Sequence, residues 1–436
     1  MQILTCHSPW FLVLLPILAM EGLVLVAHAL NLSTIPLSDP HRVATWYGWS
    51  RYLRARRYHR RRFILNLVHR STLLVILSIF LLRGGTVWYQ GQCAALALPP
   101  LLEGLLFLGT LALIGRIIAL PFQALHLFAV EKPWGFSTTS LHTFLADRLK
   151  GGFLTLFTAG PAVAMILALF SLFGPAGWLP SAVGWMFLDV VWMTLFPLVI
   201  YPLFNTVKPL PEGTLRQAIV RLAMAQTFPP GNIRILDGSR RSVRPNAMTS
   251  GLGPTKRIFL LDTLLGGHSD RAVLAVIAHE LGHHHFHHSW GLLTFSFAHK
   301  IAFFLLVALF FDRTNWLAAL GLGATAHAAL FLTFLLEGPF LLPLRLAKNA
   351  WKRRAELAAD AFAEKISGAG AELANLHLAL TRDGLFHPTP HPALVLLEYE
   401  HPPPLEREAA LRSQLTLPLS SGDDYMVIPP LFEDKL

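Results

Sequence analysis

The chain has 436 residues, of which 53% are hydrophobic and only 14% are charged. This composition excludes an ordinary soluble domain and is typical of a protein with several membrane-spanning helices. We attribute the formal net charge of +10 to membrane topology and to attraction by anionic lipids, rather than to nucleic-acid binding.

Seven apolar segments are long enough to cross a bilayer, which takes about 20 residues each. They are residues 10–30, 63–82, 101–127, 151–173, 182–206, 292–311 and 316–344. The first segment resembles a secretory signal, with a cleavage-like site at Ala27-His28-Ala29. Because Met1–Pro9 contains no Lys or Arg, we expect an uncleaved membrane anchor instead.

The loops between these segments differ strongly in charge. Eight arginines lie between the first two segments, whereas the loops on the other side contain little beyond Arg83 and Arg313. The positive-inside rule then predicts that the basic side is cytoplasmic and that the N-terminus is outside. With strict alternation, residues 207–291 and the region from 345 onward are also cytoplasmic.

The two cysteines, Cys6 and Cys93, both fall on the predicted outer side. A disulfide between them is chemically permitted there. Cys93 could equally be a small apolar residue near a membrane boundary, and both alternatives stay open. No pattern of partner residues indicates a nucleophilic thiol.

Residues 207–271 are expected to form a small mixed insert. The pattern predicts a helix near 213–227, a strand at 233–239 that runs into a turn, and a second strand at 257–262. Between these two strands, residues 246–251 form an edge strand or a loop.

The sequence His279-Glu280-Leu281-Gly282-His283 follows an apolar run at 272–278. Residues four apart share one face of a helix, so the His279 and His283 imidazoles can bind one metal ion. Zinc suits these ligands and needs one further protein ligand, which leaves a coordination position open. Glu280 is placed to transfer a proton to or from a metal-bound water molecule.

More histidines follow at positions 284, 285, 287 and 288. On a continued helix, His287 would share the face of His279 and His283. Ideal helix rise would place it about 12 Å from His279, too far for both to bind one zinc ion. Ser289 stands where a metzincin would have its third histidine. We therefore interpret these extra histidines as solvated or interfacial.

The third ligand is expected from another cytoplasmic segment. Glu356 and Asp360 lie four apart on a predicted helix at 351–367, so both carboxylates point from one face. One can bind zinc while the other orients a zinc-bound imidazole, and this pattern alone does not say which does which. The Pro-rich region from about 387 is expected to be extended and partly mobile.

Together these motifs resemble the integral-membrane type I CAAX prenyl proteases, which are zinc endopeptidases of the gluzincin kind. The resemblance covers residues 117–407. It rests on an ordered set of short stretches: Leu120-Pro121-Phe122 with Glu131, residues 135–138, Asp147, Lys150, residues 201–205, 237–239, 246–247 and 262–265, His279–His283, Asn349, Arg353, Glu356, Asp360, residues 401–403 and Arg407. Lys352 replaces the usual Ser of the family, and Pro404 interrupts an aliphatic pair.

The resemblance implies one catalytic Zn²⁺ ion held by His279, His283 and Glu356. It implies that Glu280 is the general base that activates water and later protonates the leaving amine. It also implies a fold in which seven transmembrane helices surround a polar, water-filled chamber, with a small cytoplasmic α+β zinc-metallopeptidase domain at one end.

The remaining family residues are assigned by the same resemblance. Asp360 matches an acid that orients a zinc-bound histidine. Asn246 matches a residue on the strand that aligns the substrate. His401 and Arg407 match a C-terminal pair that steadies the scissile carbonyl and nearby carboxylates, since both side chains offer donors where negative charge develops.

The expected organisation has four parts: transmembrane helices 1–5 in residues 1–206, the cytoplasmic insert in 207–291, transmembrane helices 6 and 7 in 292–344, and a cytoplasmic C-terminal region in 345–436. Charged residues inside the spans, such as Asp189 and Lys300, are expected to pair or to face a polar interior. We expect a monomer in a bilayer, in a bacterial inner membrane because the chain is rich in Ala, Leu and Arg.

The predicted function is cleavage of a peptide or protein substrate, with CAAX-type C-terminal processing of prenylated tails as the family-level activity. A first alternative is a general quality-control peptidase for membrane proteins, like the related heat-shock membrane proteases. Alternatives of another class are a non-proteolytic metal-binding protein or transporter, and an inactive scaffold.

Overall fold

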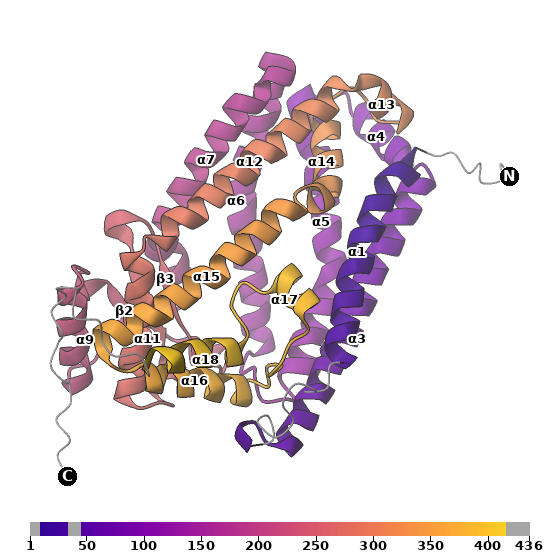
Figure 1. The fold of residues 1–436 in the computed structure, drawn as a ribbon. Coiled ribbons are helices and arrows are strands. Elements are labelled where there is room, and N and C mark those ends of the chain that lie inside the picture. The colour runs from indigo at the N-terminus through magenta and orange to yellow at the C-terminus, as the bar shows by residue number, and fades with distance from the viewer. Residues whose placement is uncertain (1–8, 34–44, 416–436) are drawn as a thin grey trace, which may run out of the picture.

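The computed structural model of the chain describes residues 9–33 and 45–415 (Figure 1). Within these ranges the protein is mainly helical, with one small four-stranded sheet. Cys93 is buried, whereas Cys6 lies outside the described residues. Whether these two cysteines pair therefore stays open between the two alternatives.

Long apolar helices make up most of the molecule. They are α1 (Trp10–Ser33), α3 (Trp49–Leu82), α5 (Pro100–Leu125), α6 (Leu141–Phe173), α7 (Trp178–Leu195), α12 (His288–Asp312) and α14 (Ala326–Phe340). By length and composition, five helical segments of the described chain could cross a membrane, or six if the bent pair of α14 and α15 (Leu342–Ser367) is counted. Many of their apolar side chains are exposed; Phe157, for example, is 72% exposed. The chain is therefore an integral, multi-pass membrane protein.

The longest of these segments, Leu141–Phe204, folds back on itself. A 3₁₀ turn at Gly174–Gly177 separates α6 from α7, which packs against α6. Gly174 adopts a positive φ of 57°, which a glycine accommodates without strain. The expected spans 151–173 and 182–206 thus fall mainly on the two arms of one helical hairpin, and the second arm continues through a π-helical turn (Phe196–Ile200) into α8 (Tyr201–Phe204).

Short helices and aromatic packing complete the membrane part. In Figure 1, α4 (Gly85–Ala95) and α13 (Thr314–Ala319) lie at the same end of the long helices. Phe107, Phe170 and Phe304 belong to one buried apolar cluster that joins several of the long helices.

Several charged side chains within the apolar helices contact one another, as expected. Arg70 donates to Glu21 at 2.9 Å. Lys300 lies 4.0 Å from the Asp189 carboxylate, which also accepts a 2.6 Å hydrogen bond from Ser296. These contacts reduce the cost of placing ionisable groups in the spans.

The insert contains the only sheet in the described residues. It comprises β1 (Val207–Pro209), α9 (Thr214–Ala225), β2 (Ile233–Leu236), β3 (Ala247–Ser250), β4 (Arg257–Leu261) and α10 (Asp262–Leu265). The strand order is β1-β2-β4-β3, in which β2 and β4 are parallel and the other pairs antiparallel. The predicted helix and both predicted strands are confirmed, and residues 246–251 form an edge strand rather than a loop. The sequence reading missed β1.

Arginine side chains tie this insert to the membrane helices. Arg241 donates two hydrogen bonds, of 2.8 and 2.9 Å, to the Asp147 carboxylate at the start of α6. Arg244 lies 3.4 Å from Glu131 and donates to the Tyr58 hydroxyl at 2.8 Å. Glu131 ends a π-helical turn (His126–Glu131) that follows α5. The motif residues Asp147 and Glu131 therefore fix the position of the sheet.

Two expectations for the C-terminal half were wrong. Residues 316–344 do not form one continuous helix: α13 ends at Ala319, α14 runs from Ala326 to Phe340, and α15 begins at Leu342 after a bend of 52°. The Pro-rich region is largely helical rather than extended in its described part, 387–415, which contains α17 (Pro392–Glu398) and α18 (Pro404–Leu415), after α16 (Gly370–Asp383). Pro392 and Pro404 each begin a helix, a position where proline's missing N–H costs nothing. Residues beyond 415 lie outside the described part.

Candidate active site

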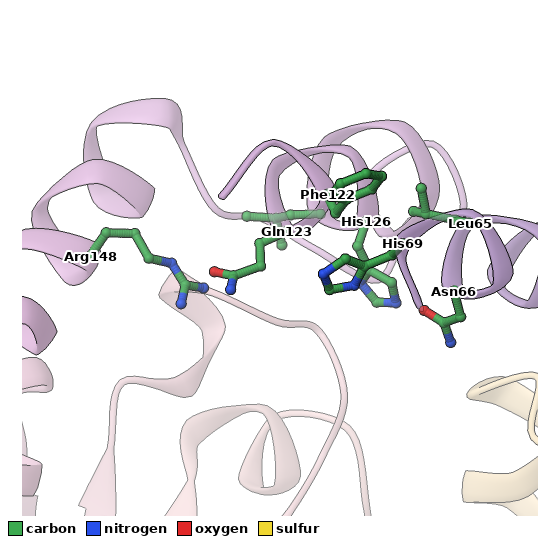
Figure 2. Close-up of a pocket in the computed structure, with 8 residues that line it drawn as sticks. Leu65, Asn66, His69, Phe122, Gln123, His126 and Arg148 are labelled. Atoms are coloured by element: carbon green, nitrogen blue, oxygen red, sulfur yellow. The ribbon is translucent and has the colours of Figure 1, made fainter. Parts of the chain in front are cut away.

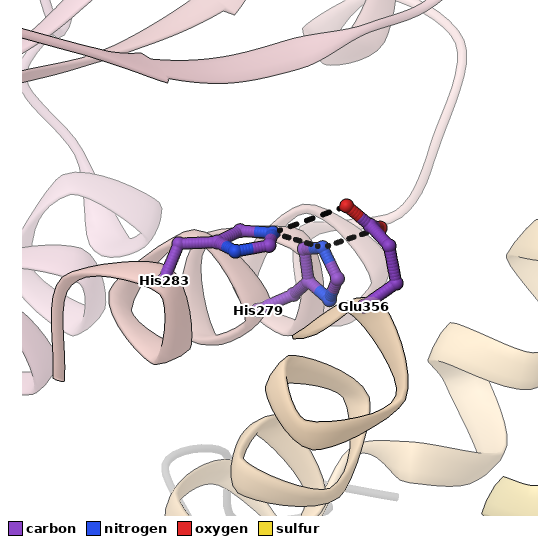
Figure 3. Close-up of side chains that lie close together, drawn as sticks. All are labelled: His279, His283 and Glu356. Atoms are coloured by element: carbon purple, nitrogen blue, oxygen red, sulfur yellow. Dashed lines mark hydrogen bonds and ion pairs between the residues drawn. The ribbon is translucent and has the colours of Figure 1, made fainter. Parts of the chain in front are cut away.

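Two histidines from one helix and a glutamate from another converge at one point (Figure 3). His279 and His283 lie on α11 (Asp270–His285), and Glu356 lies on α15. The Nε2 atoms of His279 and His283 are 3.1 Å apart, and each lies 3.5 Å from a Glu356 carboxylate oxygen. Ligand atoms of a tetrahedral zinc ion are about 3.3 Å apart. Both nitrogen donors and the carboxylate therefore fit such an ion, and three ligands leave one position open.

A close approach of two helix backbones makes this meeting possible. A Cβ atom on Gly282 would lie 3.0 Å from the Ala359 Cα and 3.1 Å from its carbonyl oxygen. A side chain at Gly282 would require the α15 backbone to shift by a few tenths of an ångström, so the glycine permits α11 and α15 to pack this closely. The Gly282 of the motif thus lets Glu356 reach the histidines.

Glu280 lies beside the three donors and is buried, with 7% of its surface exposed. Its Oε2 accepts a 2.6 Å hydrogen bond from the Thr249 hydroxyl on β3. Burial raises the pKa of the Glu280 carboxyl above its usual value, against the opposing effects of His279 and this hydrogen bond. The arrangement gives the site a carboxyl group with increased basicity.

Asp360 lies one helical turn after Glu356 and holds the far side of His279. Its Oδ1 is 2.8 Å from His279 Nδ1, although the ring N–H is not directed straight at it. Arg407 of α18 donates to both carboxylate oxygens, at 2.7 and 2.6 Å. Burial opposes ionisation, but Arg407 and the His279 contact hold the pKa of Asp360 well below its usual range.

The C-terminal residues predicted from the resemblance also reach this centre. His401 Nδ1 lies 3.0 Å from Glu356 Oε2, and its side chain is 62% exposed. Arg407 Nη1 lies 3.6 Å from the same oxygen, but Arg407 is buried. Both residues therefore contact Glu356, while only His401 faces outward.

Two other motif residues hold the segment that carries His401. Asn349 donates to the Leu397 carbonyl at 3.2 Å. Arg353 donates to the Tyr399 carbonyl at 2.8 Å and to that of Val395 at 3.2 Å. These contacts from α15 fasten the end of α17 beside the site.

Asn246 lies apart from the ligand cluster. It immediately precedes β3, and its carbonyl accepts a 3.0 Å hydrogen bond from the Leu261 N–H. Its side chain is exposed. Among the described strands, β3 pairs only with β4, so its other edge is unpaired.

The extra histidines behave differently from one another. The helix ends at His285, and His287 has a left-handed conformation with φ 53°. His287 is exposed and does not continue the face of His279, so its expected position on that face was wrong. His288, in contrast, places its Nδ1 2.7 Å from the Nδ1 of His283. It was interpreted as solvated or interfacial, but it contacts a candidate ligand.

Sequence reasoning missed three supporting residues: Thr249, His288 and His377. His377 of α16 lies 3.4 Å from Asp360 Oδ1, and burial lowers its pKa to about 4. The alternation of side chains along an edge strand was the one signal that could have indicated Thr249. No local pattern identifies His377, because it meets Asp360 only through the packing of separate helices.

Comparisons with known proteins agree with this geometry. Residues 35–206 match the family described as CAAX prenyl protease N-terminal, five membrane helices, and residues 209–415 match peptidase family M48. The chain is 30% identical to CAAX prenyl protease 1 homolog of Arabidopsis thaliana over 88% of this chain and 91% of that protein. It is 30% identical to CAAX prenyl protease 1 of Saccharomyces cerevisiae, over 71% of this chain and 72% of that protein.

A solved structure has the same fold. The crystal structure of Ste24p from S. mikatae matches with a TM-score of 0.86 at 23% identity, covering 94% of this chain and 100% of that one. The family implies a metal ion, generally zinc, and a peptide or protein substrate. The chain belongs to the M48 family of membrane zinc metalloproteases, in the group of the CAAX prenyl protease 1 homologues.

Proposed function

We propose that this protein hydrolyses peptide bonds near the C-terminus of prenylated, CAAX-type substrates, with Zn²⁺ held by His279, His283 and Glu356. The observation that carries the proposal is the convergence of these three donors beside the buried Glu280. When bound there, zinc would supply Lewis-acid chemistry for amide hydrolysis.

The protein's own residues would handle the proton and the developing charge. The Glu280 carboxylate takes a proton from the attacking water and returns it to the leaving amine. The exposed His401 imidazole is placed to donate to the carbonyl oxygen as negative charge develops on it. Asp360 keeps the His279 ring oriented. The buried position of Arg407 favours a role in holding Asp360 and Glu356 rather than in touching substrate.

The unpaired edge of β3 supports a way of aligning the peptide. An extended substrate can add to a free strand edge through backbone hydrogen bonds. Thr249 connects β3 to Glu280, so a peptide on this edge would lie next to the base. Asn246, just before the strand, would contact the peptide at one end of that edge.

We further propose seven spans around a polar chamber and a cytoplasmic site, with the N-terminus outside. The reversal between α6 and α7 supports a count of seven, with α14 and the start of α15 together as the last span. The Arg-rich start of α3 supports the orientation. The proposed division keeps residues 1–206 and 292–344 as membrane parts, and 207–291 and 345–436 as the cytoplasmic peptidase. We propose a monomer, and a bacterial inner membrane from composition alone.

The direct test compares cleavage of a farnesylated CAAX peptide with that of its unprenylated counterpart by the purified protein. The proposal predicts a higher kcat/KM for the farnesylated peptide. Equal values would indicate general peptide turnover, and no cleavage of either would favour a metal-binding protein, a transporter or an inactive scaffold. Accessibility of single cysteines introduced at Arg313 and Arg354 tests the orientation, because only Arg354→Cys should be labelled from the cytoplasm.

A further inference from the structure

A cavity with several polar side chains in its lining lies outside the site described above. It has a volume of about 320 Å³ and is lined by residues of α3, of α5 with its π-helical end, and of α6 (Figure 2). Its polar lining consists of the side chains of Asn66, His69, Gln123, His126 and Arg148. None of its lining residues is acidic. The cavity therefore offers hydrogen-bond donors and positive charge, which favours an anionic ligand.

Arg148 supplies a guanidinium that is not engaged by an acid. Within the described residues, no carboxylate lies within ion-pair distance of it; it lies over the Phe144 ring at 5.0 Å. Figure 2 shows the Arg148 side chain extended toward the Gln123 amide. Glu131, which lies 3.8 Å from the lining residue His126, also contacts Arg244 at 3.4 Å and accepts a hydrogen bond from Tyr58. The guanidinium thus remains available for a ligand.

His69 provides an independent indication of a ligand. Its Nε2 atom is buried and has no hydrogen-bond partner among the residues that the structure describes. The ring cannot easily turn away, because it stacks on Phe122 with ring centroids 4.6 Å apart and planes 19° apart. A buried polar atom without a partner is costly. A ligand oxygen in the cavity would satisfy it.

The position of the cavity indicates which anion is available. On α3 the sequence changes at Phe63 from an Arg-rich stretch to an apolar one, and His69 lies just beyond this change. On α6, Leu149 and Phe153 next to Arg148 are 65% and 62% exposed. Basic and apolar surface meet here in the way that suits a phospholipid, whose phosphate lies at the polar boundary of the bilayer.

We propose that this cavity binds the phosphate of an anionic phospholipid, with the phosphate oxygens accepting hydrogen bonds from Arg148 and His69. The acyl chains would lie along the exposed apolar side chains of α6. Such a lipid would bridge α3, α5 and α6 near the contacts that hold the sheet, Asp147 with Arg241 and Glu131 with Arg244.

The test is lipid binding to the delipidated full chain, measured by native mass spectrometry. Phosphatidylglycerol is compared with phosphatidylcholine of the same acyl chains in the wild type, Arg148→Gln, His69→Phe and Arg60→Gln. His69→Phe keeps the stacking on Phe122 but removes the ring nitrogen. Arg60 is exposed, lies in the same basic stretch of α3 and does not line the cavity, so it is the matched control for charge.

We expect phosphatidylglycerol to bind the wild type more tightly than phosphatidylcholine. Arg148→Gln should weaken that binding about tenfold, because one charge-assisted hydrogen bond is lost. His69→Phe should weaken it less. Arg60→Gln should leave it unchanged. Displacement by glycerol phosphate but not by inorganic phosphate would identify the headgroup rather than free phosphate as the ligand.

Three results would overturn the proposal: equal binding of the two lipids, unchanged binding in Arg148→Gln, or an equal loss in Arg60→Gln. Displacement of the lipid by a peptide C-terminal carboxylate at lower concentration than by glycerol phosphate would also overturn it, because the cavity would then be a peptide site. None of these outcomes depends on protease activity.

Discussion

Thr249 on the edge strand donates a 2.6 Å hydrogen bond to the carboxylate of Glu280 on the metal-site helix. This contact joins the strand that would align a peptide to the base that would activate water. A peptide added to β3 would therefore be held at a fixed position relative to Glu280, the group that acts on it.

Replacing Thr249 by Val keeps the side-chain shape but removes the hydroxyl. We predict that kcat falls about tenfold, because a hydrogen bond to a charged group is lost, while zinc content stays at the wild-type level. Steady-state cleavage and metal analysis measure the two quantities. Thr249→Ser keeps the hydroxyl and should retain most activity; wild-type kcat in Thr249→Val would contradict the proposed connection.

Gly282 sets the spacing of α11 and α15. We predict that Gly282→Ala lowers the free energy of unfolding by about 1–3 kcal/mol and weakens zinc binding, because the new Cβ would push against the Ala359 backbone. Thermal unfolding and chelator competition measure these effects. Gly151→Ala in α6 is the control, since nothing lies within 4 Å of a Cβ there. Equal behaviour of the two variants would show that the close approach is unimportant.

His288 contacts His283 through its Nδ1 atom. If it accepts the Nδ1–H of His283, it leaves the Nε2 lone pair of His283 for the metal. We predict that His288→Ala weakens zinc affinity about tenfold or more, as measured by competition with a chelator. His287→Asn tolerates the left-handed backbone and should leave the affinity unchanged. A similar loss of zinc affinity in both variants would mean that the specific contact between His288 and His283 is not what supports zinc binding.

Arg407 and Asp360 form a buried pair with two hydrogen bonds. We predict that Arg407→Gln lowers the free energy of unfolding by about 3–5 kcal/mol, because it leaves a buried carboxylate without its partner. Arg51→Gln breaks an exposed ion pair with Asp383 and should cost less than about 1 kcal/mol. Comparable unfolding midpoints for the two variants would show that the buried pair does not support the site.

Much of the fold could be predicted because its signals are local. Long apolar runs indicated the spans, alternation indicated the strands at 233–239 and 257–262, and four-residue spacing placed His279 with His283. The C-terminal helices were missed because their prolines were interpreted as breakers. Pro392 and Pro404 stand at helix starts, where proline is favourable.

The contacts that complete the site could not be predicted from local patterns. His377 meets Asp360, and Thr249 meets Glu280, only because separate elements pack together. Even the end of α11 depended on context, since the helix ends at His285 and His287 adopts a left-handed conformation within the His-rich stretch 283–288.

The central claim is that Glu280 acts on the proton while His279, His283 and Glu356 hold zinc. The most direct measurement is zinc content together with peptide cleavage for the wild type, Glu280→Gln and Glu356→Gln. We predict one zinc ion in the wild type and in Glu280→Gln, with cleavage by Glu280→Gln reduced at least about a hundredfold, and loss of both zinc and cleavage in Glu356→Gln. Wild-type cleavage by zinc-loaded Glu280→Gln would contradict the account.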